Sequence, residues 1–145
     1  MYKRILLPTD GSETSRRAVQ AGVEFARGIG AEIVGLHVTP PFHLLTANSQ
    51  MLEDTPEQYA ADCSQRARRV LTDVESVARA AGITFRLEHV SSNAPHEAII
   101  ETAKRLRCDL IMMASHGRHG VKGLLLGSET QKVLGHSAMP VLVHR

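Results

Sequence analysis

The sequence of 145 residues contains no apolar stretch long enough to cross a membrane or to direct secretion. A membrane helix needs about 20 consecutive apolar residues, and a signal peptide needs an apolar region of roughly 7–15 residues. The N-terminal segment has only the apolar run Ile5–Leu7 before Pro8. We therefore expect no signal peptide and no membrane association.

Cysteine and concentrated charge are also scarce. The two cysteines, Cys63 and Cys108, form no CxxC motif, and both are interpreted as small buried hydrophobes. A reducing cytoplasm is the expected location. The net charge is +2 without a run of five like charges, which argues against a dedicated nucleic-acid-binding protein. The densest basic stretch, Arg66–Arg69, lies in a helical pattern and is interpreted as a solvated helix face.

The common phosphate and catalytic fingerprints are missing. GxxxxGK[ST] is absent because Lys122 is followed by Gly123, and GxGxxG is absent as well. The sequence therefore excludes a P-loop ATPase and an NAD dehydrogenase. GxSxG is missing too, so we predict no catalytic residue. His116 and His119 have HxxH spacing, but a zinc site needs three or four ligands and no third partner is evident, so we predict no metal site.

Strand-like and helix-like segments alternate along the chain. Strands are expected at 3–7, 32–38, 83–90, 109–114 and 140–144, and helices from 12, over 56–81, from 93 to near 107, and from 128. This alternation predicts βαβ units and a parallel sheet covered on both faces. We expect one domain over residues 1–145, a three-layer α/β sandwich with a five-stranded, flavodoxin/Rossmann-like sheet in the strand order 3-2-1-4-5.

In such a sheet, ligands bind beyond the carboxyl ends of the strands, where the strand order reverses. The residues that matter most for function therefore follow the strands directly, at 8–12, 38–40, 91–93 and from 114 onward. The segment from Phe42 to Thr55 has no clear period, and a loop of that length is usually functional or disordered. We predict that this segment becomes ordered over a bound ligand.

The most informative segment is the glycine-rich stretch from Ala114 to Ser128, which has four glycines in eleven residues. Glycines allow the backbone to approach a ligand and to turn its N–H groups inward. Ser128 is predicted to begin a helix and to form a capping box with Gln131. Because a helix N-terminus attracts anions, the segment predicts a phosphate site. From composition alone, a flexible surface loop followed by a helix cap remains the alternative.

These features together resemble the universal stress protein family, over essentially all 145 residues. Nucleotide-binding members of that family carry glycine, two residues, glycine, nine residues, and then glycine followed by serine or threonine. Here Gly117 matches the second glycine, and Gly127-Ser128 matches the closing pair. The first position is Ala114, a departure that would be strained if the site required a positive φ. Segments 5–12, 36–38 and 139–143 also resemble the family's first strand and turn, second strand and closing strand.

The resemblance implies an adenine nucleotide, ATP in particular, bound on an adenine nucleotide alpha hydrolase-like fold. Asp10 would lie beside the base or ribose, although an aspartate in this position is also a common turn former. Val38 would meet the adenine edge through its backbone, and Mg²⁺ is a plausible companion of the phosphates. The implied nucleotide-binding residues are Pro8, Thr9, Asp10, Val38, Met113, Ala114, His116, Gly117, Gly127, Ser128 and Glu129.

Three functions remain open at this point. The first is an ATP-binding stress-response protein whose nucleotide state changes the surface offered to an unknown protein partner. The second is a dimeric stress scaffold without nucleotide, and the third is a slow ATP hydrolase. Val141–Val143 is an apolar strand at the sheet edge, which invites pairing, and the resemblance implies a homodimer formed through this strand.

Overall fold

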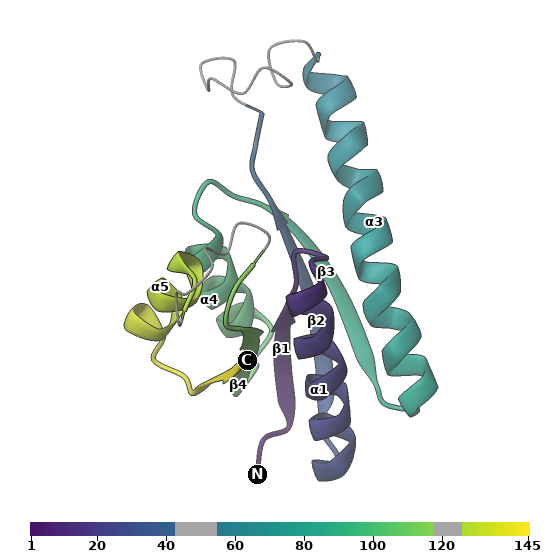
Figure 1. The fold of residues 1–145 in the computed structure, drawn as a ribbon, viewed down its shortest axis with the longest axis vertical. Helices are drawn as coiled ribbons and strands as arrows, with labels where there is room; N and C mark the ends of the chain where they lie inside the picture. Colours follow the sequence, from purple (N-terminus) through teal and green to yellow (C-terminus); the bar gives the residue numbers. More distant parts are fainter. Residues whose placement is uncertain (43–54, 118–125) are drawn as a thin grey trace.

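The computed structural model describes residues 1–42, 55–117 and 126–145, which form a sheet between two layers of helices (Figure 1). The strands are β1 (Arg4–Pro8), β2 (Glu32–Thr39), β3 (Phe85–Ser91), β4 (Leu110–Ala114) and β5 (Val141–His144). The helices are α1 (Glu13–Ile29), α3 (Pro56–Ala81), α4 (Pro95–Arg105) and α5 (Ser128–His136).

The five strands are all parallel and lie in the order β3-β2-β1-β4-β5. Helices α1 and α3 pack together on one face of the sheet, and α4 and α5 pack together on the other (Figure 1). Every residue of β4 is buried, as expected for a strand covered on both faces. The predicted three-layer fold and strand order are confirmed.

The predicted element boundaries are correct to within two residues, and two of the differences have clear causes. The third strand begins at Phe85 rather than Ile83, because the N–H of Ile83 donates to the carbonyl of Ala78 in the cap of α3. This cap is closed by Gly82, which has φ 68°. Helix α4 ends at Arg105, and Arg107 then adopts φ 56°, which no α-helix can include.

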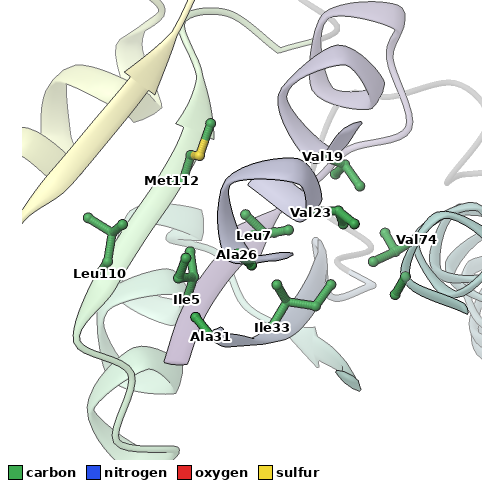
Figure 2. Packing of buried hydrophobic residues seen from close by; sticks show 11 residues of the cluster. Ile5, Leu7, Val19, Val23, Ala26, Ala31, Ile33, Val74, Leu110 and Met112 are labelled. Atoms are coloured by element: carbon green, nitrogen blue, oxygen red, sulfur yellow. The ribbon is translucent and has the colours of Figure 1, made fainter. Parts of the chain in front are cut away.

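A hydrophobic core lies on each side of the sheet. On the α1 and α3 side, Val23 and Val74 reach toward Leu7 and Ile33 of the central strands (Figure 2). Leu6, Ile99, Met113 and Val133 belong to the core on the α4 and α5 side.

The two cysteines, Cys63 and Cys108, are both buried free thiols. Burial raises the pKa of Cys108 to about 11, so its thiol stays protonated at neutral pH. The prediction that both cysteines are small buried hydrophobes is confirmed. In the part of the chain that the structure describes, no helix combines the length and apolarity of a membrane span.

Gly35 determines how closely α3 can approach β2. A Cβ atom at Gly35 would lie 2.8 Å from Val74 Cγ1 and 3.2 Å from Leu87 Cδ2. Protein cores are packed too densely to absorb an added methyl group without displacement. The missing side chain at Gly35 therefore allows Val74 to reach the sheet.

We expect Gly35→Ala to lower the free energy of unfolding by about 1–2 kcal/mol, because the new methyl group collides with Val74. Val74→Ala should cost about 2 kcal/mol, because it leaves a cavity. In the double variant, the added methyl group occupies the vacated space, so the combined loss should fall short of the sum by at least about 0.5 kcal/mol. Urea denaturation measures all three variants.

Gly28→Ala is the matched control, because a Cβ atom at Gly28 of α1 meets nothing within 4 Å. Alanine has the higher helix propensity, so this change should raise the stability by about 0.5–1 kcal/mol. Strict additivity of Gly35→Ala and Val74→Ala would contradict the proposed contact.

Candidate functional site

The order of the sheet reverses between β1 and β4, because the chain continues from β1 to β2 and from β4 to β5. The paired residues of β1 and β4 end at Leu6 and Ile111, before either strand ends. A cavity of about 410 Å³ lies beyond this point, between the carboxyl ends of the two strands. This is the position where open α/β sheets bind ligands.

The structure brings all eleven predicted nucleotide-binding residues together around this one cavity. Its lining comprises Pro8, Thr9, Asp10, Val38, Met113, Ala114, His116, Gly117, Gly127, Ser128 and Glu129, and in addition Ser15, Leu36, Pro95, Ile99 and Thr130. The last five were not predicted from the sequence. Ser15 and Thr130 lie in the first turn of a helix that follows a strand, which is a signal that could have found them. Pro95 and Ile99 belong to α4, whose approach to the cavity depends on packing.

Asp10 fixes the turn between β1 and α1 and also lines the cavity. Its Oδ1 accepts hydrogen bonds from the N–H of Ser12 at 2.9 Å and from the hydroxyl of Ser15 at 2.7 Å. Gly11 in the same turn has φ 81°, a conformation that favours glycine. Asp10 therefore has the turn-forming role that was the alternative interpretation of this residue, and it also lines the cavity.

Gly117 lies directly opposite this carboxylate. A Cβ atom at Gly117 would lie only 2.6 Å from Oδ2 of Asp10. Gly127 is also confined, because a Cβ atom there would lie 3.3 Å from the carbonyl oxygen of Ser115. The backbone of Gly127 has φ −68°, so close packing rather than an unusual conformation accounts for this glycine.

The N-terminus of α5 differs from the prediction. The predicted capping box of Ser128 and Gln131 is wrong, because the N-cap is Gly127 and no side chain makes a capping hydrogen bond. The side-chain amide of Gln131 instead donates to the carbonyl of Leu126 at 3.1 Å. The first hydrogen bond within the helix runs from the N–H of Gln131 to the carbonyl of Gly127. The N–H groups of residues 128–130 come before this bond and are not part of the helical hydrogen-bond pattern. Such a helix end attracts anions.

Ala114 ends β4 without strain. In the residues that the structure describes, only Arg107 among non-glycine residues has a positive φ, so Ala114 keeps an ordinary backbone conformation. Its carbonyl accepts a buried hydrogen bond of 3.0 Å from the hydroxyl of Thr130, which ties β4 to α5. The concern that alanine at this position forces a costly φ is therefore removed.

Glu129 directs its carboxylate toward α4. Its Oε2 accepts a hydrogen bond from the backbone N–H of His96 at 2.9 Å, and its Oε1 accepts one from Lys132 Nζ at 3.2 Å. Burial would raise the pKa of Glu129, but the hydrogen bonds from Lys132 and His96 outweigh it, and the pKa lies below its ordinary value. Only the backbone N–H of Glu129 therefore remains as a donor for an anion.

The end of β2 presents backbone groups to the other side of the cavity. The carbonyl of Leu36 accepts a hydrogen bond from Thr9 N–H at 2.8 Å, just beyond the last pair of the β1–β2 ladder, Pro8 and Leu36. Since backbone groups alternate in direction along a strand, those of Val38 point to the same side, past the end of β1.

The buried side chain of His37 contacts the backbone of Thr9. His37 Nδ1 lies 2.9 Å from the carbonyl oxygen of Thr9, to which it donates a hydrogen bond. His89, the neighbour of His37 across the sheet, accepts or donates one hydrogen bond with Thr39 at 2.9 Å. Burial, and then the nearby His37, lower the pKa of His89, so His89 resists acquiring a positive charge.

Two predicted features lie outside the described residues. They are the ligand-covering segment, of which 43–54 is not described, and the middle of the glycine-rich loop, residues 118–125, which includes His119. Within the described ranges, no group of three or more His, Cys, Asp or Glu side chains could hold a metal ion.

The sheet has five parallel strands, and both the cavity and the N-terminus of α5 lie where the strand order reverses, between β1 and β4. These features define a Rossmann-like, nucleotide-binding type of fold. The sequence profile of the universal stress protein family matches residues 1–145, and the chain belongs to this family.

Two archaeal relatives illustrate the similarity. Universal stress protein MJ0531 of Methanocaldococcus jannaschii is 30% identical over 145 residues, which cover 99% of this chain and 82% of the relative. The solved structure of MJ0577, from the same organism, is 31% identical, has a TM-score of 0.83, and covers 99% of this chain and 95% of its own. A universal stress protein in complex with cAMP shares the fold, with a TM-score of 0.72, 24% identity, and coverage of 99% and 97%.

The depressed pKa of Glu129 predicts a pH-dependent contribution to stability. Because its folded-state pKa lies below the ordinary value of 4.5, the ionised carboxylate stabilises the fold above that pH, and the contribution is lost as the pH falls through the folded-state pKa. We expect Glu129→Gln to lower the stability at neutral pH, with a difference from wild type that shrinks at acidic pH.

Denaturation at about pH 7 and about pH 3 measures this difference. Glu101→Gln, which changes an exposed carboxylate on α4, is the control and should leave the stability nearly unchanged at both values. A Glu129→Gln deficit of equal size at neutral and acidic pH would contradict the assigned ion pairing.

Proposed function

We propose that this protein binds an adenine nucleotide, ATP in the first instance, in the cavity between β1 and β4, and acts as a cytoplasmic stress-response regulator. The observation that carries the proposal is the convergence of all eleven residues implied by the family's nucleotide pattern on one cavity of about 410 Å³. That volume lies within the usual range for small-molecule sites, about 300–1,000 Å³.

The surfaces of the cavity fit the parts of a nucleotide. The backbone of Val38 would meet the edge of adenine, and the Asp10 carboxylate would face the ribose. The phosphates would lie against Gly117 and the first N–H groups of α5, where the missing side chains leave room. Mg²⁺ would arrive with the phosphates and offset the nearby Asp10 charge.

Thermal denaturation tests the proposal directly. A ligand at a hundred times its dissociation constant stabilises the native state by about 2.7 kcal/mol, which raises the Tm of a domain of this size by about 5–10 °C. We expect this shift with millimolar ATP and Mg²⁺, and a smaller one with GTP, because the Val38 backbone matches the adenine edge.

Gly117→Val should abolish the shift, because its side chain would occupy the space between Asp10 and the phosphates. Gly135→Ala is the matched glycine control, since a Cβ atom there meets nothing within 4 Å, and it should keep the full shift. Ala114→Gly should lower the Tm without nucleotide and leave the shift unchanged, because Ala114 is unstrained. If wild type and Ala114→Gly show no shift with any nucleotide, the scaffold function is supported instead.

Phosphate release distinguishes a third possibility, slow ATP hydrolysis. We propose no catalytic residue, so any release by wild type should be no faster than by Gly117→Val. A clear excess over that variant would support the hydrolase function.

We also propose that two copies pair through β5. Among the described strands it has one neighbour, β4, so no described strand covers its outer edge, and its residues are only partly buried. The opposite edge, β3, carries Arg86 and Glu88, and charged side chains on an edge strand discourage pairing. The two edges therefore differ in a way that favours association through β5.

Leu142→Lys should convert the dimer to a monomer, because it places a charge in the middle of the apolar edge. Ile29→Lys replaces an exposed apolar residue at the end of α1, away from this edge, and should leave the mass unchanged. Light scattering at micromolar concentration measures both variants. A monomeric mass for wild type would refute the proposed dimer.

A further inference from the structure

A second hollow is lined mainly by residues of α1 and α3. These two helices cover the face of the sheet opposite to α4 and α5 (Figure 1). The hollow consists of two adjoining parts of about 310 and 700 Å³, which share Gly11, Arg16, Val70 and Asp73 in their linings. We call the two parts together the α1–α3 groove.

The groove combines an apolar floor with a basic rim. The floor is lined by four valines, Val19, Val70, Val74 and Val77, of which the first three are buried core residues and Val77 is the most exposed. The rim carries four arginines, Arg16 from α1 and Arg66, Arg68 and Arg69 from α3. The last three are exposed on α3, in agreement with their interpretation as a solvated helix face, and they also line a concave surface.

The charge on this rim is largely uncompensated. Arg16 pairs with Asp73 at 3.1 Å. In the described part of the chain, no carboxylate lies within ion-pair distance of Arg66, Arg68 or Arg69. Four arginines elsewhere on the surface, Arg17, Arg79, Arg86 and Arg105, each pair with a glutamate. The three unpaired guanidinium groups therefore gather where the surface is hollowed.

The groove shares a wall with the cavity between β1 and β4. Thr9 lines both, Asp10 lines the cavity, and Gly11 lines the groove. The turn that joins β1 to α1 therefore separates the two sites, and a shift of this turn would alter both.

We propose that the α1–α3 groove docks an acidic segment of a partner protein that also carries apolar side chains. Arginine pairs with carboxylates through two parallel hydrogen bonds, so the unpaired guanidinium groups complement Asp and Glu side chains. The valine floor complements apolar side chains, which a nucleic-acid backbone does not offer. Asp73 within the rim would also repel a continuous row of phosphates.

Selection from a random peptide library tests the proposal without knowledge of the partner. Short peptides displayed on phage are selected on the wild-type protein and counter-selected on Arg66→Glu/Arg69→Glu. We expect the recovered peptides to be rich in Asp and Glu interspersed with Leu, Ile, Val or Phe. Recovery without acidic enrichment would overturn the proposal.

Fluorescence anisotropy with the most enriched peptide then measures affinity. Arg66→Glu/Arg69→Glu should weaken binding at least about tenfold, because two attractive contacts become repulsive. Arg27→Glu/Lys104→Glu makes the same change in net charge at exposed positions outside the groove and should change affinity less than about twofold. Equal losses in both variants would show a general charge effect and overturn the proposal.

Two altered probes separate the two halves of the recognition. One peptide variant has Asn and Gln in place of Asp and Glu and tests the arginine rim. The other has Ser in place of the apolar residues and tests the valine floor. Both replacements should weaken binding. A single-stranded DNA oligonucleotide that binds as tightly as the peptide, with the same response to Arg66→Glu/Arg69→Glu, would assign the groove to nucleic acid. Arg66→Ala/Arg69→Ala repeats the test without introducing repulsion and should also lose affinity.

The link between the two sites rests on the proposed nucleotide function and has a separate readout. We expect saturating ATP to change the peptide affinity at least about fivefold, the lower end of typical allosteric coupling. Peptide binding is measured first without nucleotide, so the test of peptide docking in the groove does not depend on ATP binding. An unchanged affinity in a protein that shows the ATP-induced Tm shift would overturn the coupling.

Discussion

The central constraint on this protein is the turn that carries the chain from the middle strand of the sheet into α1. β1 lies between two strands and ends at Pro8, and α1 begins only five residues later at Glu13. The reversal is possible because Gly11 takes a left-handed conformation and Asp10 binds the first turn of the helix. The same bonds set the position of the carboxylate at the edge of the sheet and the starting point of α1 over the core.

The overall fold could be predicted from the sequence because its signals are local and repeated. Apolar runs such as Leu110–Ala114 alternate with long amphipathic segments such as Pro56–Ala81, and a parallel sheet is the arrangement that satisfies both. The boundaries were less accurate where several conformations compete. Ile83 is as apolar as its neighbours, yet the cap of α3 uses its N–H group before the strand can.

The candidate site could be predicted to the extent that it consists of residues following strands. Pro8, Val38 and Met113 come to one edge whenever parallel strands end together, so their place follows from topology. Ile99 reaches the cavity only through the packing of α4, which no local pattern describes. Ser128 was misassigned as a cap because its sequence suits that role, whereas Gly127, which packs closely against Ser115, takes the N-cap position and Ser128 is the first residue of the helix.

The N-terminus of α5, where the N-cap residue Gly127 makes no side-chain hydrogen bond, affects the elements that follow it. Ser12 and Thr55 supply hydroxyl groups that hold the first turns of α1 and α3 closed, but α5 has no such group of its own. A short helix that leaves its opening donors to a dissolved anion would fray or tighten with the concentration of that anion. Because α5 leads through a short connection into the edge strand β5, solute composition would set the order of this whole C-terminal corner.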